Sequence, residues 1–269
     1  PNRIVEAEID NLRKLGVHFQ TDVIIGKTIS IDELKAEGFQ GIFVGSGAGL
    51  PNFMDIPGEN ALNIMSSNEY LTRVNLMDAA NPSTDTPINL GKKVLVVGGG
   101  NTAMDSCRTA KRLGADVTLV YRRSEAEMPA RIEEVKHAKE EGIKFLTLHN
   151  PKEYLTDENG AVKAAVLDVM QLGEPDQSGR RRPETTGETI TIECDQVIVA
   201  VGVSPNPLVP KSIEGLTLGR KNTIAVNDQM QSSRKEIYAG GDIVRGGATV
   251  ILAMGDGRRA AMNMSKQLT

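Results

Sequence analysis

The sequence predicts an α/β fold in which parallel strands alternate with helices. One observation is a continuous apolar run at residues 93–97, followed by a glycine-rich turn, a helical pattern and a second apolar run at 117–121. Another is that short apolar runs elsewhere, such as 42–44, lead directly into glycines, where the backbone can approach a ligand closely. The 269 residues and the 39% hydrophobic content suffice for one large domain or two of ordinary size.

The first third of the chain combines helical patterns with short strands. A helix is expected over residues 4–15, ended by Gly16, and a strand over 17–19. A second strand starts at Gly41 and runs into glycines. Residues 78–91 are polar, contain two prolines and lack apolar periodicity, so we expect a linker and a domain boundary there.

The rest of the chain continues the α/β pattern around one interruption. Short alternating stretches over 154–193, broken by turn residues, predict an antiparallel excursion, after which 196–201 returns to a buried strand. A strand over 236–239 and a helix opening at 246–249 are expected near the C-terminus. The remaining expected elements are the strands 93–97, 117–121 and 144–148 and the helices 102–113 and 132–141.

The composition narrows the range of functions. The formal net charge is −4, from 31 basic and 35 acidic residues spread along the chain. This distribution gives no basic patch that would bind nucleic acid or an anionic membrane. The three histidines lack metal-ligand spacing, and Cys107 and Cys194 lie too far apart for a dithiol motif. No apolar run approaches the roughly 18 residues that span a bilayer, and no signal peptide is visible. We therefore expect a cytoplasmic protein without a metal site.

The most specific motif is the turn after the strand 93–97. Gly98-x-Gly100-x-x-Ala103 follows a strand, opens a helix and lies inside a strand–helix–strand unit, the setting of a Rossmann dinucleotide-binding loop. Gly98 permits the tight turn, Gly100 lets the main chain approach a pyrophosphate, and Ala103 allows close helix packing. The helix N-terminus adds amide groups and a positive dipole. A glycine-rich turn without a ligand is the alternative.

The end of the second strand indicates which dinucleotide is bound. An NAD-binding domain usually presents Asp or Glu to the ribose there, but this chain has Arg122, Arg123 and Ser124. Two guanidinium groups can hold a 2′-phosphate through forked hydrogen bonds, whereas a hydroxyl gains little from them. The sequence therefore favours NADPH over NADH, with a solvated basic turn as the alternative.

Three further segments carry weaker signals. Ala200-Val201-Gly202 would pass beside the nicotinamide, because ligands lie outside the carboxyl ends of parallel strands. Gly241-Asp242 and the helix start at 246–249 could bind a polyol and an anionic flavin atom, although a turn with an N-cap explains them equally well. Arg180-Arg181-Arg182 is interpreted as a solvated hairpin tip rather than an anion site.

Several motifs occur together in one order along the chain. They are VLVVGGGNTAMD at 94–105, YRRS at 121–124, MPA at 128–130, GEPD at 173–176 and GRR at 179–181. In this combination the chain resembles the small (beta) subunit of NADPH-dependent glutamate synthase and its relatives, which include the flavin half of dihydropyrimidine dehydrogenase. The resemblance covers essentially the whole chain.

The resemblance implies a Rossmann-like NADPH domain, residues 88–203, inserted in an incomplete glutathione-reductase-like FAD domain. Residues 1–87 would be part of the FAD domain with a linker, and 204–269 its C-terminal part. Electrons would pass from NADPH through FAD toward iron–sulfur clusters and a partner, either the glutamate synthase large subunit or another electron-accepting subunit. The residues carried over by position are Gly98, Gly100, Asn101, Thr102, Ala103, Arg122 and Arg123 for NADPH, and Gly45, Gly47, Gly241, Asp242, Ala248 and Thr249 for FAD.

One departure from the family bears on activity. Family members begin with a cysteine-rich cluster-binding region and a first glycine loop for FAD, and neither is found here, so we expect a C-terminal fragment with an incomplete FAD site. Such a chain is either an NADPH-to-flavin electron-input enzyme or an NADPH-binding module that is inactive alone. A thioredoxin-reductase-like activity needs a dithiol that two isolated cysteines do not provide. Strand edges left open would favour self-association, so a homo-oligomer is also considered.

Overall fold

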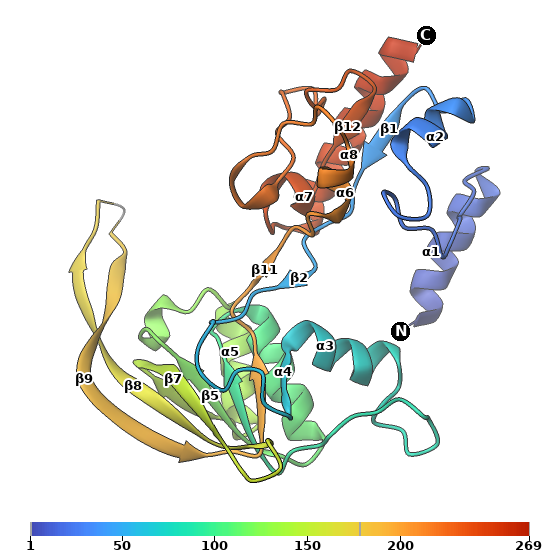
Figure 1. Ribbon diagram of the computed structural model, residues 1–269. Helices are drawn as coiled ribbons and strands as arrows, with labels where there is room; N and C mark the ends of the chain where they lie inside the picture. The colour runs from blue at the N-terminus through green and yellow to red at the C-terminus, as the bar shows by residue number, and fades with distance from the viewer. Residues whose placement is uncertain (1, 178, 269) are drawn as a thin grey trace. The chain divides into compact units, whose positions relative to one another are not determined.

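The computed structural model describes residues 2–177 and 179–268, which divide into two compact units (Figure 1). Unit 2, residues 49–204, is one continuous stretch of chain, whereas unit 1 combines residues 1–48 with residues 205–269. Pro1, Ser178 and Thr269 lie outside the described residues.

A five-stranded parallel sheet forms the centre of unit 2. Its strand order is β3-β10-β4-β5-β6, and every neighbouring pair is parallel. The strands are β3 (Ile64–Ser66), β10 (Gln196–Val199), β4 (Lys93–Val97), β5 (Asp116–Tyr121) and β6 (Lys144–Thr147). β4 is buried from Val94 onward and contains only valine and leucine there, as a strand covered on both faces requires.

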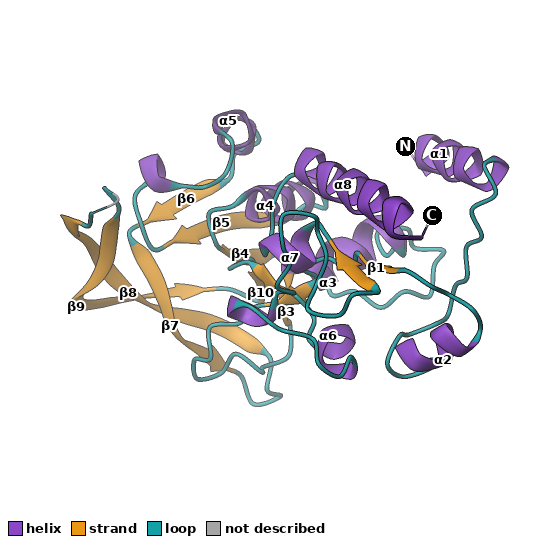
Figure 2. Ribbon diagram, turned by 90° about the horizontal axis from the view of Figure 1, so that it is seen from above, coloured by secondary structure: helices purple, strands orange, loops and turns teal. Residues whose placement is uncertain are grey.

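Helices cover one face of this sheet, and a second sheet covers the other (Figure 2). Alternate residues of β4 divide between the two cores, with Val94 and Val96 facing the helices and Leu95 and Val97 facing the second sheet. The helices are α3 (Ser67–Leu71), α4 (Asn101–Arg112) and α5 (Ile132–Glu140), and the antiparallel strands are β7 (His149–Thr156), β8 (Val162–Pro175) and β9 (Arg181–Glu193). Unit 2 is therefore a three-layer α/β domain, which confirms the predicted fold class.

Short elements connect these layers. α3 continues into η1 (Thr72–Leu76), a π-helical turn, and η2 (Glu125–Glu127) is a 3₁₀ turn after β5. α4 ends before Gly114, whose φ of +100° lets the chain reverse while the Ala115 N–H donates to the Ala110 carbonyl. The chain enters and leaves unit 2 through β2 (Leu50–Pro51) and β11 (Val203–Ser204), which pair antiparallel.

Unit 1 is built on a two-stranded parallel sheet. β1 (Ile42–Val44) pairs with β12 (Ile237–Ala239), and both strands contribute to a core that includes Ile31, Ile224 and Ile243. The helices of this unit are α1 (Asn2–Lys14), α2 (Ile31–Ala36), α6 (Leu208–Ser212), η3 (Arg220–Asn222), α7 (Asp242–Arg245) and α8 (Val250–Leu268). α2 begins with a capping box between Ser30 and Glu33, which fixes its start.

Two details differ from the expectations drawn from the sequence. Residues 17–19 form no strand, because they find no strand to pair with, and Val17 and Phe19 remain exposed. The irregular segment 78–91 is present, but unit 2 begins before it, at Gly49. The reason is that β3 pairs with β10, and that Tyr70 is only 1% exposed in the helix-side core of unit 2.

Candidate functional site

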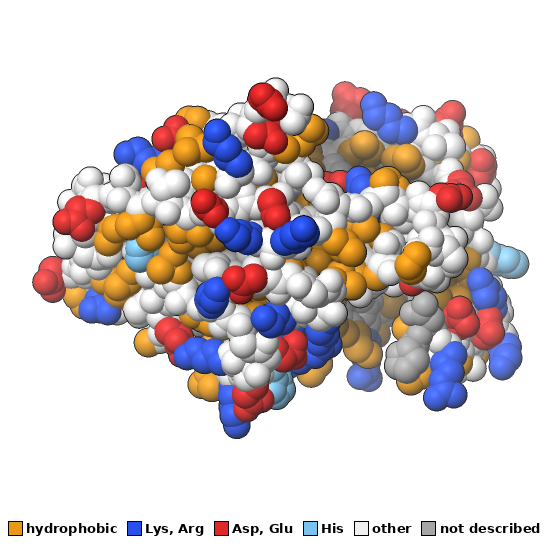
Figure 3. Space-filling view, turned by 90° about the horizontal axis from the view of Figure 1, so that it is seen from below, with side chains coloured by type: hydrophobic (Ala, Val, Ile, Leu, Met, Phe, Trp, Pro, Cys, Tyr) orange, Lys and Arg blue, Asp and Glu red, His pale blue; other side chains and the backbone are white. Residues whose placement is uncertain are grey.

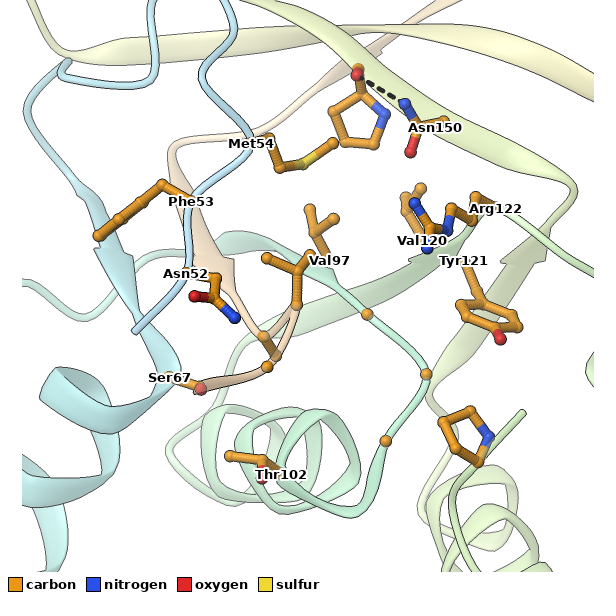
Figure 4. Close-up of a pocket in the computed structure, with 18 of the residues that line it drawn as sticks. Asn52, Phe53, Met54, Ser67, Val97, Thr102, Val120, Tyr121, Arg122 and Asn150 are labelled. Atoms are coloured by element: carbon orange, nitrogen blue, oxygen red, sulfur yellow. Dashed lines mark hydrogen bonds between the residues drawn. The ribbon is translucent and has the colours of Figure 1, made fainter. Parts of the chain in front are cut away.

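A cavity of about 650 Å³ lies within unit 2, at the carboxyl ends of β4, β5 and β10 (Figure 4). Its walls also include residues 52–54 and 149–151. The volume is that of a small-molecule or cofactor site. Its position, outside the carboxyl ends of parallel strands, is where open α/β sheets bind ligands.

Two glycines in the turn after β4 have different surroundings: one packs against the protein backbone, and the other faces open space. Gly98 has a φ of +142°, and a Cβ there would lie 2.3 Å from the carbonyl oxygen of Ala200. At Gly100 no atom lies within 4 Å of the place a Cβ would take, and this residue lines the cavity. Gly98 therefore lets the loop pack against the end of β10, while Gly100 leaves the backbone accessible from the cavity.

The start of α4 faces the same cavity. Gly100 is the N-cap and offers no side chain to the first N–H groups of the helix, and Thr102 lines the cavity. Asn101 and Ala103 do not line it. The Asn101 Oδ1 accepts a hydrogen bond from the Arg131 N–H at 2.9 Å, and Ala103 is fully buried against the sheet. Within this predicted loop, Asn101 and Ala103 therefore hold the helix in place.

Unpaired positive charge lies at the β5 end of the cavity. Arg122 and Arg123 both line it; Arg122 is exposed, whereas Arg123 is only 8% exposed. The buried Nε of Arg123 has no hydrogen-bond partner among the described residues. No Asp or Glu belongs to the described residues that line the cavity. A buried guanidinium without a counterion is costly unless a ligand supplies the negative charge.

Backbone and side-chain contacts hold the arginine-bearing turn. The Leu148 N–H donates to the carbonyl of Arg123 at 3.0 Å, and the Tyr121 hydroxyl donates to the carbonyl of Glu127 at 2.9 Å. The Tyr121 ring lies so close to Gly99 that a Cβ at Gly99 would be 2.6 Å from it. Burial raises the pKa of Tyr121, and the neighbouring arginines oppose that effect. At neutral pH the phenol is therefore a neutral hydrogen-bond donor.

The β10 end of the cavity is uncharged. Ala200, Val201 and Gly202 line it, and the Asn52 N–H donates to the Gly202 carbonyl at 3.0 Å. In Figure 4, Asn52 and Ser67 lie on one side of the glycine loop, and Tyr121 and Arg122 lie on the other. The cavity therefore extends across the loop from a cationic end to a neutral end.

A buried carboxylate fixes the segment that covers the neutral end. Glu59 is 8% exposed, and its carboxylate accepts hydrogen bonds from the N–H groups of Met54 and Asp55 at 2.7–3.0 Å. The Tyr154 N–H donates to the Pro57 carbonyl at 2.9 Å, so the segment is also attached to β7. These contacts hold residues 52–56 as a fixed wall of the cavity.

The residues predicted for FAD lie in unit 1. Because Val44 pairs with Ala239, the turns that contain Gly45 and Gly241 leave the same edge of the two-stranded sheet. The Asp242 carboxylate accepts a hydrogen bond from the Ala248 N–H at 2.8 Å. Gly47 and Thr249 complete the predicted set, and the Thr249 Oγ1 accepts from the Leu252 N–H at 3.4 Å as an N-cap of α8.

An ion pair braces this region of unit 1. Asp256 of α8 is 1% exposed and forms two 2.6 Å hydrogen bonds with the Arg245 guanidinium, and it also accepts from the Gly241 N–H at 3.1 Å. The hydrogen bond from Arg245 is the largest cause of the lowered pKa of Asp256. The glycine-rich turn after β12 is therefore stabilised by charges within the protein itself.

Several lining residues were not predicted from the sequence. Asn52, Ser67, His149 and Asn150 come from segments with no recognisable spacing relative to the glycine loop. The tip of the β8–β9 hairpin contributes another, Arg180. The run of arginines predicted a solvated position there; Arg180 is exposed, and it also lines the cavity. Only the run of three arginines could have drawn attention to it.

The fold and the cavity define a dinucleotide-binding domain of the kind found in oxidoreductases. The chain belongs to the pyridine nucleotide-disulphide oxidoreductase family, whose profile matches residues 4–257. Membership of this family of NAD(P)-dependent flavin oxidoreductases bears out the predicted cofactors, NADPH and FAD.

Among curated relatives, the chain is 35% identical to the NADPH-Fe(3+) oxidoreductase subunit beta of Geobacter sulfurreducens, with 100% of this chain and 42% of that protein covered. It is 34% identical to the putative glutamate synthase [NADPH] small chain of Cereibacter sphaeroides, with 97% and 64% covered. The chain thus spans well under two thirds of the first relative and slightly under two thirds of the second. Among solved structures, FprA of Mycobacterium tuberculosis in complex with NADPH has the same fold, with a TM-score of 0.75 at 20% identity, over 92% of this chain and 67% of that one.

Further features of the described residues concern the requirements of a membrane span, a metal site, a reactive thiol and a nucleic-acid surface. No helix in the described ranges is long and apolar enough to cross a membrane, and within them no three His, Cys, Asp or Glu side chains are grouped to hold a metal ion. Cys107 and Cys194 are both buried, and burial raises the pKa of both thiols. On the face that Figure 3 shows, Lys and Arg side chains are mixed with Asp and Glu, which gives no continuous cationic surface for nucleic acid there.

Proposed function

We propose that this chain is the electron-input part of an NADPH-dependent flavin oxidoreductase of the glutamate synthase small-subunit type. Unit 2 binds NADPH in the cavity above β4, β5 and β10. Its 2′-phosphate lies at Arg122 and Arg123, its pyrophosphate at Gly98, Gly100 and Thr102, and its nicotinamide beside Ala200–Gly202. Electrons leave through FAD for a partner subunit.

The observation that carries the proposal is the buried, unpartnered Arg123. The residue is 8% exposed, its Nε is buried without a hydrogen-bond partner among the described residues, and the described lining of the cavity contains no carboxylate, so an anion beside it would remove the cost of the unpaired donor. A 2′-phosphate carries nearly two negative charges and several acceptor oxygens, which suit forked hydrogen bonds from guanidinium groups. The ribose hydroxyl of NADH offers no such charge. The cavity therefore favours NADPH.

The two ends of the cavity, one cationic and one neutral, suit a dinucleotide. The open backbone at Gly100 and the start of α4 lie between the two ends, where amide groups and the helix dipole favour a pyrophosphate. The neutral end, with Val201 and Asn52, suits an uncharged nicotinamide ring and its carboxamide. The residues of unit 2 thus position the cofactor along the cavity.

The residues of unit 1 fit one side of a flavin site. Gly247 has no atom within 4 Å of where a Cβ would lie, so a ligand could approach the backbone there. The start of α8 adds amide groups, and Val250 and Ile251 are 75% and 81% exposed, which suits contact with an aromatic ring system. When bound, FAD would supply the hydride and one-electron chemistry.

The partner and the final acceptor are proposed from the relatives. One of them is named as a subunit of an NADPH-Fe(3+) oxidoreductase and another as a glutamate synthase small chain, and this chain spans 42% and 64% of them. The glutamate synthase large subunit is thus one candidate partner, and a different electron-accepting subunit is another. The cytoplasm, where NADPH is available, is the proposed location.

A second candidate function is NADPH binding without turnover. It is favoured by the fact that the whole cavity lies within unit 2, so cofactor binding does not depend on a complete flavin site. A visible spectrum of the protein after incubation with FAD and gel filtration separates the two. A flavin band that bleaches when NADPH is added supports the enzyme, and a colourless protein supports the binding module.

Calorimetric titration of the purified chain with NADP⁺ and NAD⁺ tests the cofactor assignment. In the double variant Arg122→Ala/Arg123→Met, NADP⁺ affinity should fall about 100-fold, since two charge-assisted contacts are lost, and NAD⁺ affinity should change less than about twofold. The single variant Arg123→Met should also raise the melting temperature of the ligand-free protein, because the buried, unpaired Nε donor of Arg123 disappears.

Arg112→Ala is the matched control, because this arginine is exposed on α4, pairs with Glu141 and does not line the cavity. It should leave both affinities unchanged. Equal losses for NADP⁺ and NAD⁺ in the double variant would refute the 2′-phosphate assignment.

A further inference from the structure

We propose that Arg180, at the tip of the β8–β9 hairpin, is a third guanidinium for the 2′-phosphate, so that the antiparallel sheet helps to select NADPH over NADH. This inference rests on the proposed function and extends it. It gives a role to a part of unit 2 that lies outside the dinucleotide-binding β–α–β unit.

The position and the free charge of Arg180 are the first observation. Its side chain lines the same cavity as Arg122 and Arg123, and no hydrogen bond or salt bridge joins that side chain to another described residue. The positive charges of all three arginines act on the Tyr121 phenol, which places Arg180 near the β5 end of the cavity rather than the nicotinamide end. Three cations therefore lie around one region of the cavity, whose described lining contains no carboxylate.

The anchoring of the hairpin tip is the second observation. Arg181, the next residue, forms a salt bridge with Glu127 at 3.4 Å. The Glu127 carboxylate also accepts hydrogen bonds from Ser124, from its N–H at 3.2 Å and its hydroxyl at 3.1 Å. Ser124 directly follows Arg122 and Arg123. The tip is thus tied to the turn that carries the other two arginines.

The base of the hairpin is rigid. Val162, Ala165 and Leu167 of β8 are buried in the core between the two sheets, at 3% exposure or less. At the far end, the Arg180 N–H donates to the Asp176 carboxylate at 3.0 Å, and the Asp176 N–H donates back to the Arg180 carbonyl at 3.0 Å. These contacts fix the backbone of Arg180, so that only its side chain has to be ordered when a ligand binds.

The chemistry of the ligand suits a third contact. A 2′-phosphate presents three strong acceptor oxygens, and two arginines do not exhaust them. Arg180 is exposed, unlike Arg123, so solvent and salt weaken its contribution. We expect Arg180 to raise NADP⁺ affinity about fivefold, well below the combined effect of Arg122 and Arg123.

The test is calorimetric titration of the full chain with adenosine 2′,5′-bisphosphate and with AMP, which differ only in the 2′-phosphate. In Arg180→Ala, affinity for the bisphosphate should fall about fivefold while affinity for AMP stays the same, and Arg180→Lys should show a smaller loss. Arg182→Ala is the matched control, because this arginine lies on the same hairpin and does not line the cavity. It should bind both ligands as the wild type does.

The outcomes separate the two proposals. Wild-type protein that binds both ligands equally well overturns the NADPH assignment, and the role of Arg180 with it. Wild-type protein that prefers the bisphosphate, with the same preference in Arg180→Ala, overturns the role of Arg180 alone. Equal losses for the bisphosphate and AMP in Arg180→Ala also overturn it, because they place Arg180 at the adenine or the 5′-phosphate.

Discussion

Two glycine-rich helix starts can be compared within this chain, the one before α4 in unit 2 and the one before α8 in unit 1. Before α4, the N-cap is Gly100 and the arginines nearby have no counterion among the described residues. Before α8, Thr249 caps the helix, Asp242 holds the Ala248 N–H, and the turn is braced by the Arg245–Asp256 pair.

The difference shows how the groups around a glycine-rich helix start determine whether it favours an anionic ligand. Around α4 the protein leaves hydrogen-bond donors and positive charge unsatisfied, which lowers its own stability and favours an anion. Around α8 the same kinds of groups satisfy one another, so the turn that we propose to contact FAD is already held in place before the flavin binds. Glycines alone do not distinguish the two cases; the partners of the neighbouring charges do.

The largest effect on stability and binding is expected at Gly98, in the turn before α4. In Gly98→Ala the new Cβ would clash with the Ala200 carbonyl at 2.3 Å and the residue would keep a φ of +142°. The free energy of unfolding should fall by about 3 kcal/mol, and NADP⁺ binding should be lost. Urea unfolding followed by circular dichroism and calorimetric titration measure the two effects.

Gly100→Ala is the control for that change. Its Cβ meets no atom within 4 Å and its φ is −90°, so stability should be unchanged while NADP⁺ affinity falls, because the methyl group occupies the side open to the cavity. A stable Gly98→Ala that binds NADP⁺ normally would show that the loop is not held against β10 as described.

An intermediate effect on stability is expected at Asp256, which braces the turn before α8. Asp256→Asn weakens the pair with Arg245 and should lower the free energy of unfolding of unit 1 by about 2 kcal/mol at pH 7. Since the pKa of Asp256 is lowered in the folded state, its contribution is present above the ordinary Asp pKa of about 4 and is lost as the pH falls through the lowered value. The difference in the free energy of unfolding between wild type and Asp256→Asn should therefore become smaller at acidic pH.

Hydrogen exchange of peptides from residues 240–260, measured at pH 7, localises the effect. Faster exchange should be confined to unit 1, and NADP⁺ affinity should not change, because none of these residues lines the cavity. Unchanged exchange there would mean that the Arg245–Asp256 pair does not brace the turn.

The smallest effect is expected at Thr249. Thr249→Ala removes the N-cap of α8, whose hydrogen bond of 3.4 Å is long, so the loss should be about 0.5 kcal/mol of unfolding free energy. Thr249→Ser keeps the oxygen and serves as the control. A change in the melting temperature that is equal in both variants would assign the effect to the lost methyl group rather than to the cap.

Local patterns in the sequence predicted most of the elements of unit 2. The continuous apolar runs of β4 and β10 identified buried parallel strands, and the glycines at 98 and 114 located the two ends of α4. The expected strand at 17–19 did not form, because alternation alone supplies no pairing partner. The edge strand β3 was missed for the opposite reason, since its three residues pair only with the distant β10.

Local sequence patterns likewise predicted only part of the candidate site. The structure brings Gly98, Arg122 and Gly202 to one cavity, as the rule about carboxyl ends of strands predicts. Arg180 could not be placed in that way, because its position depends on the length and register of β8 and β9. The unpartnered state of Arg123 was also hidden, since a sequence shows which charges exist and not which of them lack partners.

The pairing of β2 with β11 has a consequence for the order of folding. Leu50 lies opposite Ser204, so the two ends of unit 2 are hydrogen-bonded neighbours. β1 must find β12 across the whole of unit 2, and on the ribosome β12 emerges only after unit 2 has been synthesised. Once unit 2 has folded, the loop that separates β1 from β12 is effectively short, so the entropy of closing it is small. We therefore expect unit 2 to fold first and unit 1 to fold after it.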